Sequence, residues 1–171
     1  MQLGQLGRLR ELPRERVLAT ARTNDEDSHR LSLGRPHAAV SVAGVDKTTV
    51  EQWLARYVEA WQTYDPRAIG ALFSEDAVYR YHPWDEDEKT VRGRDAIVAS
   101  WLEERDPPGS WTAEYAPWAT DGERVVAVGV SRYLTEDRTA IEREYHNVFL
   151  LQFDAENRCR EFTELFMRRS D

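Results

Sequence analysis

The sequence predicts an α+β fold in which a curved sheet, antiparallel or mixed, forms a cone around helices that precede it in the chain. Three observations support this fold class. Every Phe, Tyr and Trp lies between Trp53 and Phe166, helical periodicity occupies the first part of that region, and strand-like alternation fills the rest. Helices followed by antiparallel strands are typical of a sheet that is covered on one face. A sheet that curls around the first helix would leave a cavity beside it.

The first 45 residues differ in composition from the remainder. They contain no aromatic side chain and mix Arg, Glu, Asp, Ser, Gly and Pro. Such a segment buries too little apolar surface to offset its ordering entropy. We therefore expect residues 1–45 to be a disordered or weakly structured extension and residues 46–171 to be the domain. Two alternatives are a partner-binding tail and a segment that does not belong to the native protein.

Three helices are expected at the start of the domain. Thr48 and Glu51 have the spacing of a capping box, and a helix to about Tyr64 would follow. Its apolar face carries aromatic side chains four residues apart. The dipeptide Asp65-Pro66 combines a good N-cap with a good first helical residue, so a short helix should run to about Phe73. The third helix should follow Gly93, with its inner side formed by Ala96, Ile97, Ser100 and Trp101.

Five strands are expected around these helices. The first reads "AVYRYHP", is closed by Pro83 and leads into a solvated acidic loop, Asp85–Glu88. Asp121-Gly122 predicts a hairpin turn between two of the later strands. These later strands are expected at residues 111–118, 123–134, 139–153 and 158–169.

Bulk properties exclude several function classes. The net charge is −8 and the pI about 5.1, which disfavours binding to nucleic acid or to an anionic membrane. No apolar run is long enough to span a membrane. The single cysteine, Cys159, cannot form an internal disulfide, so we expect a cytoplasmic protein. No dinucleotide or phosphate-binding loop is present, and no metal-ligand set is complete, so neither a cofactor nor a metal is expected.

Glu164 interrupts an apolar alternation on the last expected strand. It shares one face with Phe162 and Phe166. A carboxyl buried there would have a raised pKa, which suits a general acid/base or a ligand anchor. The alternative is that this face is half exposed, or that Glu164 pairs with an arginine.

The long strand at 139–153 has two distinct faces. The more aromatic face carries Asn147 and Phe149 and should turn inward, where Asn147 could meet a ligand. The other face carries Glu144 and His146, which would lie outside and face a second subunit in a homodimer.

Aromatic residues elsewhere could line a pocket for a flat ligand, because Tyr and Trp favour sites with one dry and one wet end. A plain aromatic core is the alternative for each of them. With Asn147 and Phe149, the candidate ligand-binding residues are Trp61, Tyr79, Tyr81, Trp84 and Trp101. His82 follows at the end of the first strand, and an imidazole can donate or accept a proton near neutrality. The alternative is a strand-end histidine bonded to a neighbouring loop.

Several short motifs resemble one superfamily. These are "YVEAW" at 57–61, "EDAVY" at 75–79, "HP" at 82–83, "GRDAI" at 93–97 and the closing stretch 149–167. Over about residues 46–168 the chain is similar to nuclear transport factor 2-like proteins, a cystatin-like α+β barrel, and more narrowly to SnoaL-like domains, named for a polyketide cyclase. The superfamily hosts cyclases, ketosteroid isomerases, epoxide hydrolases, dehydratases and non-catalytic binding modules, so the resemblance implies the fold and leaves the reaction open.

The ketosteroid isomerase pattern matches only in part. Tyr57 falls at the position of that family's helix-one tyrosine. The two carboxylate positions fall at Tyr81 or His82 and near Phe149, so both carboxylates are missing. The resemblance implies a protein that binds a small, mostly apolar or aromatic molecule. If it is an enzyme, Tyr57 would hold an oxyanion and His82 or Glu164 would move the proton. The alternative is a non-catalytic ligand-binding or dimerisation module.

Overall fold

A computed structural model describes residues 44–103 and 105–170. The expected extension, residues 1–45, therefore lies outside the described residues except for Gly44 and Val45. Val45 packs against the hydrophobic core, and its backbone N–H donates to the carbonyl of Gly122 at 2.9 Å. A Cβ on Gly44 would lie 2.6 Å from the same carbonyl oxygen, so only glycine fits this close approach. These two residues belong to the domain, although the composition boundary falls after them.

Three helices open the domain. Helix α1 (Lys47–Thr63) begins at Asp46, whose carboxylate accepts from the backbone N–H of Thr49 at 2.8 Å. The capping box predicted at Thr48 is therefore wrong, because the aspartate two residues earlier is the N-cap. Helix α2 (Pro66–Leu72) begins at Asp65 as expected, and α3 spans Arg94–Glu103.

The strands form one six-stranded sheet. They are β1 (Phe73–Arg80), β2 (Val91–Arg92), β3 (Trp111–Asp121), β4 (Arg124–Leu134), β5 (Ile141–Phe153) and β6 (Cys159–Arg168). The spatial order is β2-β1-β6-β5-β4-β3, with β1 parallel to β6 and every other pair antiparallel. A 3-10 turn, η1 (Asp87–Lys89), lies between β1 and β2.

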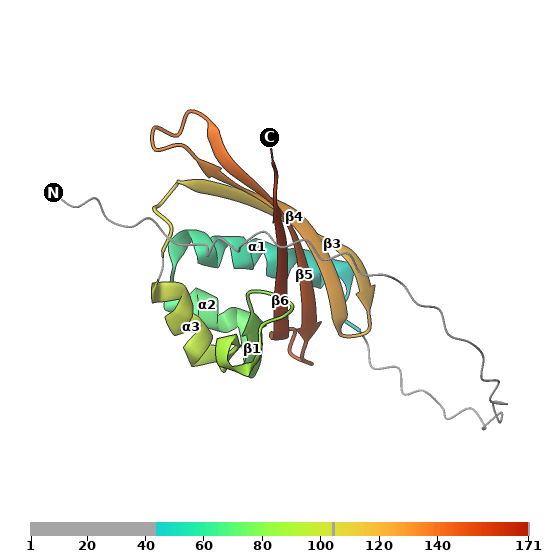
Figure 1. The fold of residues 1–171 in the computed structure, drawn as a ribbon. Coiled ribbons are helices and arrows are strands. Elements are labelled where there is room, and N and C mark those ends of the chain that lie inside the picture. The colour runs from blue at the N-terminus through green and yellow to red at the C-terminus, as the bar shows by residue number, and fades with distance from the viewer. Residues whose placement is uncertain (1–43, 104, 171) are drawn as a thin grey trace, which may run out of the picture. The chain divides into compact units, whose positions relative to one another are not determined.

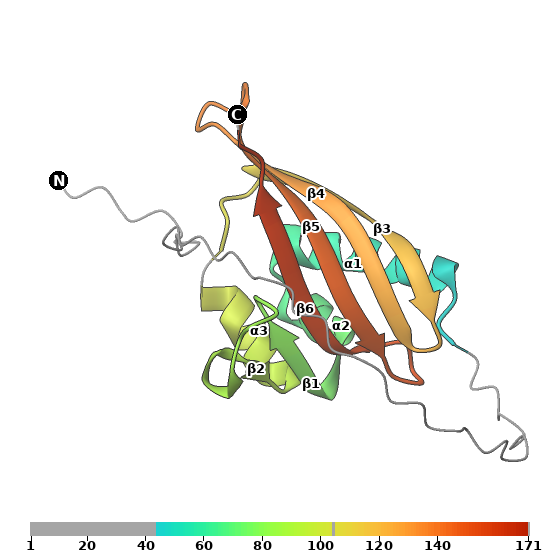
Figure 2. The same cartoon turned by 45° about the vertical axis from the view of Figure 1, so that its right-hand side comes forward.

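The helices lie on one side of this sheet. Figures 1 and 2 show α1 running across the inner face of β3–β6, with α2 and α3 beside β1. The α+β architecture with helices inside a curved mixed sheet is therefore as predicted. The sheet does not close into a full barrel, since β2 and β3 remain edge strands.

Two sequence predictions fail locally. Strand β1 ends at Arg80, not at Pro83, so Tyr81 and His82 lie in the loop that follows it. Ala96 is exposed, whereas Ile97 and Trp101 are buried on the inner side of α3. At the end of β1 a tertiary contact accounts for the difference, because the Tyr81 hydroxyl bonds the hydroxyl of Ser100 of α3 at 2.8 Å.

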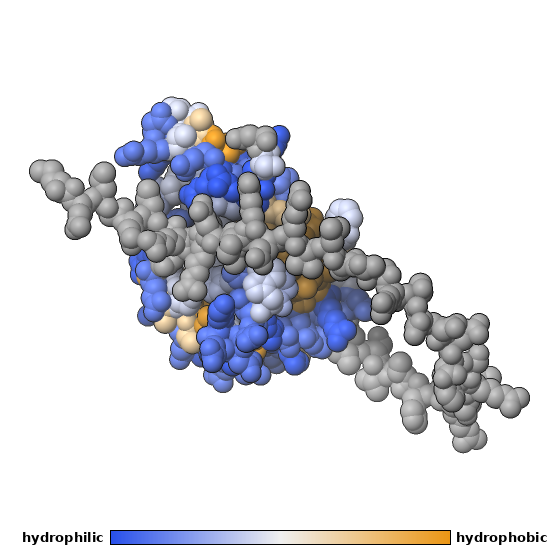
Figure 3. All heavy atoms as spheres, viewed as in Figure 1, coloured by the Kyte–Doolittle hydropathy of each residue, from blue (hydrophilic) through white to orange (hydrophobic). Residues whose placement is uncertain are grey.

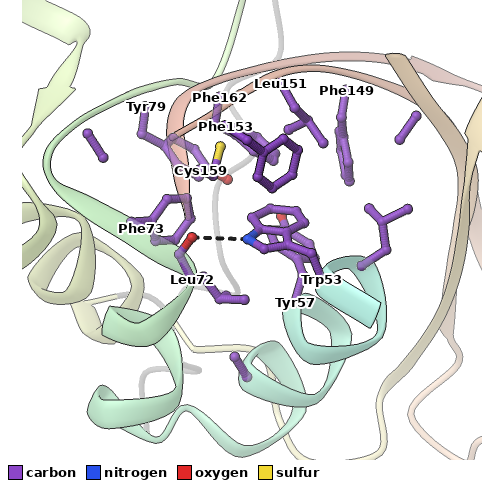
Figure 4. Close-up of a cluster of buried hydrophobic side chains, with 14 of the residues drawn as sticks. Trp53, Tyr57, Leu72, Phe73, Tyr79, Phe149, Leu151, Phe153, Cys159 and Phe162 are labelled. Carbon is purple, nitrogen blue, oxygen red and sulfur yellow. Dashed lines mark hydrogen bonds between the residues drawn. The ribbon is translucent and has the colours of Figure 1, made fainter. Parts of the chain in front are cut away.

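The core lies between α1 and the sheet. Figure 4 shows side chains of β5 and β6 directed at Trp53 of α1, whose indole N–H donates to the carbonyl of Leu72 at 3.0 Å. Phe153 meets the same indole edge-on, with ring centroids 5.5 Å apart. The indole hydrogen bond satisfies a carbonyl at the end of α2, and the packing holds α1, α2 and the sheet together.

Candidate functional site

Glu164 lies on the inner face of β6, where the sequence alternation placed it. Its carboxylate Oε1 accepts from the side-chain amide of Asn147 at 2.8 Å. Burial raises the pKa of Glu164 to about 7, and the hydrogen bond from Asn147 offsets part of that rise. Within residues 44–103 and 105–170, no ion pair involves Glu164, so the expected alternative of an arginine partner does not apply.

The Glu164 carboxyl is surrounded by protein but not sealed. The residue is half-buried, yet enough protein surrounds the carboxyl to disfavour its charged form. At a pKa of about 7 the carboxyl is present in both protonation states near neutral pH, which is what general acid/base chemistry requires.

A chain of polar side chains orients the Asn147 amide. The hydroxyl of Ser131 lies 3.3 Å from the amide oxygen of Asn147 and donates to it. Burial raises the pKa of Tyr115, and the neighbouring Ser131 offsets part of that rise. With its amide oxygen toward Ser131, Asn147 presents its NH2 group to the carboxyl of Glu164. Strands β4, β5 and β6 therefore each contribute one member of a connected network, Ser131, Asn147 and Glu164, and Tyr115 of β3 lies beside it.

Two tyrosine hydroxyls lie near this network. Tyr57 of α1 and Tyr79 of β1 are 5% and 3% exposed, and each lies close enough to shift the pKa of the other. The pKa of each is raised well above its ordinary value, first by burial and then by neighbouring groups that include Glu164. Both hydroxyls therefore stay protonated and remain hydrogen-bond donors at neutral pH.

Aromatic rings occupy much of the space beside α1. Tyr57 stacks on Phe162 at 5.7 Å between centroids and meets Trp101 edge-on at 5.2 Å. Two surface depressions lie elsewhere, one between α2 and α3 and one on the outer face of the sheet, and neither is lined by Tyr57, His82 or Glu164. The cavity expected beside α1 therefore stays a prediction.

His82 lies in the loop after β1. Its ring stacks on Trp84 at 5.1 Å and lies 5.6 Å from Phe166 of β6. Its Nδ1 is 3.2 Å from the carboxylate of Asp85, whose side chain is only 4% exposed. The prediction that Asp85–Glu88 is a solvated loop is wrong for Asp85, because that carboxylate is turned inward onto His82.

The remaining candidate ligand-binding residues fall into three groups. Phe149, Tyr79 and Trp101 are core side chains at 0%, 3% and 8% exposure. Trp61 is half-buried, stacks on Trp111 and donates to Asp106 at 3.0 Å. Trp84 is 61% exposed and stands apart from the core.

Sequence reasoning missed three members of the site: Tyr115, Ser131 and Asp85. Tyr115 and Ser131 each carried a usable signal, because strand alternation places Tyr115 on the face of Trp111 and Ser131 on the face of Ala127. Asp85 carried no such signal, because an acidic residue within a run of acidic residues is expected to be exposed to solvent.

Two further properties concern only the described part of the chain. No three His, Cys, Asp or Glu side chains among residues 44–103 and 105–170 are grouped as a metal ion would need. None of the helices in these same stretches is long and apolar enough to cross a membrane.

The α+β architecture, with helices on one side of a curved mixed sheet, is that of a nuclear transport factor 2-like protein. The SnoaL-like domain family matches residues 54–161, and the chain belongs to that family. No curated protein matches the chain.

Solved structures agree on the fold. An NTF-2 like protein of unknown function from Burkholderia xenovorans LB400 is 14% identical, with a TM-score of 0.55 over 72% of this chain and 87% of that one. A protein of unknown function with a cystatin-like fold from Methylobium petroleophilum PM1 is 17% identical, with a TM-score of 0.53 over 75% and 82%. A protein with a ketosteroid isomerase-like fold from Catenulispora acidiphila DSM 44928, in complex with trimethylamine, is 17% identical, with a TM-score of 0.50 over 67% and 84%.

Proposed function

We propose that this protein binds a small, mostly apolar molecule against the inner face of its sheet and moves a proton on it with Glu164. The observation that carries the proposal is a half-buried carboxyl with a pKa of about 7, oriented by an amide and not neutralised by a cation among the described residues. An inward-facing carboxyl without a cationic partner costs stability, which a site for proton transfer would explain.

The neighbouring side chains suit the remaining roles. A carbonyl compound that loses an α-proton to Glu164 develops negative charge on its oxygen. The Tyr57–Tyr79 hydroxyl pair would donate to that oxygen, and their raised pKa keeps both protonated. The candidate lining residues would hold the apolar body of the ligand. The site would then perform isomerisation, cyclisation or dehydration with side chains of this chain alone.

Hydrogen exchange at carbon tests this proposal without knowledge of the natural substrate. Small cyclic ketones are incubated with the full chain in D2O, and loss of the α-proton is followed by NMR. We expect exchange above the buffer rate and a loss of about 10²–10⁴-fold in Glu164→Gln. The matched control is Glu88→Gln, which removes a carboxylate from the exposed loop. An exchange rate in Glu164→Gln equal to that of the wild type would reject the role of Glu164.

A second candidate function, a dimerisation module, is favoured by the outer face of the sheet. Val128, Val130, Val148 and Met167 help line a depression of about 310 Å³ there, and Leu150 and Met167 are 44% and 67% exposed. Figure 3 shows hydrophobic side chains gathered over strands β4 and β5. We propose that a second copy of this chain covers this outer apolar patch.

The charges beside the outer apolar patch suit a two-fold interface. Arg132 pairs with Glu114 at 2.9 Å and with Glu144 at 2.8 Å, and Arg169 lies 3.2 Å from Glu144. Such a mixed-charge cluster can pair with its own two-fold copy. His146 lies among these outer residues, as expected for an interface position.

Sedimentation velocity tests the dimer. The wild type should sediment as a dimer and Leu150→Glu as a monomer. Ile141→Glu, which changes an exposed side chain of the same strand outside the patch, should remain dimeric. A monomeric wild type at about 100 μM would reject the interface, because stable interfaces of standard size have dissociation constants well below that concentration.

The expected cytoplasmic location stays a prediction.

A further inference from the structure

The loop after β1 is closed by a carboxylate that makes two polar contacts with a single residue. Asp85 Oδ2 accepts from the backbone N–H of His82 at 3.0 Å, and Asp85 Oδ1 lies 3.2 Å from His82 Nδ1. The backbone N–H of Asp85 returns a hydrogen bond to the carbonyl of His82 at 3.1 Å. The Asp85 side chain is 4% exposed, unlike the acids that follow it.

These contacts determine which ring nitrogen of His82 carries the proton. A backbone N–H is always a donor, and it occupies one carboxylate oxygen of Asp85. The other oxygen can only accept, so the nitrogen that faces it, Nδ1, must hold a proton. In the neutral ring Nε2 then carries the lone pair. Nε2 makes no hydrogen bond to any other side chain or backbone group in the described stretches.

Two aromatic rings hold the imidazole in place. Trp84 stacks on it with an interplanar angle of 18°, and Phe166 of β6 packs against it. Phe166 is two residues from Glu164 on the same strand face. The imidazole is therefore at the end of β6 that carries Glu164.

We propose that Asp85 is a positioning residue that fixes His82 with its proton on Nδ1 and so makes Nε2 a second proton acceptor at the rim of the site. Its use in turnover rests on the proposed function, whereas the tautomer itself does not. When Nε2 takes a proton from a bound molecule, the ring becomes an imidazolium and the neighbouring Asp85 carboxylate stabilises its charge. The same proton can then be returned elsewhere on that molecule, so no co-reactant is needed.

NMR of the full chain, labelled with 15N-histidine and held above the pH at which histidine titrates, tests the tautomer. The wild type should show His82 protonated at Nδ1. Asp85→Asn should reverse this: its amide oxygen must face the backbone N–H, so its NH2 group faces Nδ1 and moves the proton to Nε2. A wild type with the proton on Nε2 would overturn the proposal by itself, whatever the variant does to the loop.

Reactivity of the ring tests whether Nε2 is a usable acceptor. Diethyl pyrocarbonate attacks the unprotonated ring nitrogen, and mass spectrometry locates the product. Because a hydrogen bond to a charged acceptor shifts such an equilibrium by at least about tenfold, we expect Asp85→Asn to slow His82 modification by about tenfold. His146, which makes no contact with Asp85, is the internal control, and its rate should be the same in the wild type and in Asp85→Asn.

The two proposals can fail separately. Equal His82 modification in wild type and variant would overturn the role of Asp85. The ketone exchange experiment could fail while the tautomer result stands, because neither His82 measurement uses a substrate. Glu164→Gln should leave the His82 tautomer as it is in the wild type.

Discussion

Replacing Glu164 by Gln should change how the stability of the domain depends on pH. The pKa of Glu164 is about 7 in the folded protein, against an ordinary value of 4.5. At pH values below 4.5 the carboxyl is protonated in both the folded and the unfolded chain, so it does not lower the free energy of unfolding. Between the two values the unfolded chain releases the proton while the folded chain keeps it, so stability falls as the pH rises. Above about 7 both states are ionised and the loss is complete.

The size of the effect follows from the separation of the two pKa values. Each unit is worth about 1.4 kcal/mol, so the full loss is about 3 kcal/mol, of which about 2–3 kcal/mol falls between pH 5 and 8. Because the side chain is partly accessible, solvent screening makes this an upper bound. Urea unfolding, followed by tryptophan fluorescence, gives the free energy at each pH by linear extrapolation.

The comparison of variants isolates Glu164 from other titrating groups. The free energy of unfolding of Glu164→Gln, minus that of the wild type, should grow by about 2–3 kcal/mol from pH 5 to 8 and flatten above pH 7. For Glu88→Gln the same difference should stay constant. A difference for Glu164→Gln that does not vary with pH would refute the reasoning, since it would mean that folding leaves the carboxyl as hydrated as in the unfolded chain.

Three further substitutions test the site and the core. Asn147→Leu removes the hydrogen bond that lowers the pKa of Glu164, so an NMR titration of the carboxyl should give a midpoint above that of the wild type; an unchanged midpoint would contradict the contact. Phe162→Ala empties a fully buried position and should cost about 3–5 kcal/mol in urea unfolding, and a cost below about 1 kcal/mol would mean that the core is not packed there. Gly129→Ala would drive a Cβ into the backbone carbonyl of Glu114, so we expect a loss of about 1–3 kcal/mol, and full stability would show that β3 and β4 can separate at no cost.

Much of the fold could be predicted because its signals are local. Strand alternation correctly assigned the inner face of β5, where Asn147 and Phe149 are 5% and 0% exposed. It also placed Glu164 on the inner face of β6. The hairpin turn at Gly122 followed from a residue that adopts a φ of +60°. These features depend on residue type and on the alternation of apolar and polar residues, and both can be seen directly in the sequence.

The features that could not be predicted depend on contacts between distant segments. Strand β1 ends early because the Tyr81 hydroxyl forms a hydrogen bond with a residue 19 positions away. No local sequence pattern predicts that contact. The Asp85 side chain is inward although the three residues after it are acidic and exposed, because its carboxylate contacts His82. The Ser131–Asn147 bond likewise joins two strands whose register only the folded sheet specifies.

The most direct measurement is a 13C NMR titration of the Glu164 carboxyl in the full chain, assigned with Glu164→Gln. Our account predicts a midpoint of about 7, because protein surrounds the carboxyl and its hydrogen-bond partner is the neutral amide of Asn147. A midpoint at or below the ordinary value of 4.5 would contradict it, since that carboxyl would stay ionised at neutral pH and could not serve as the acid/base of the site.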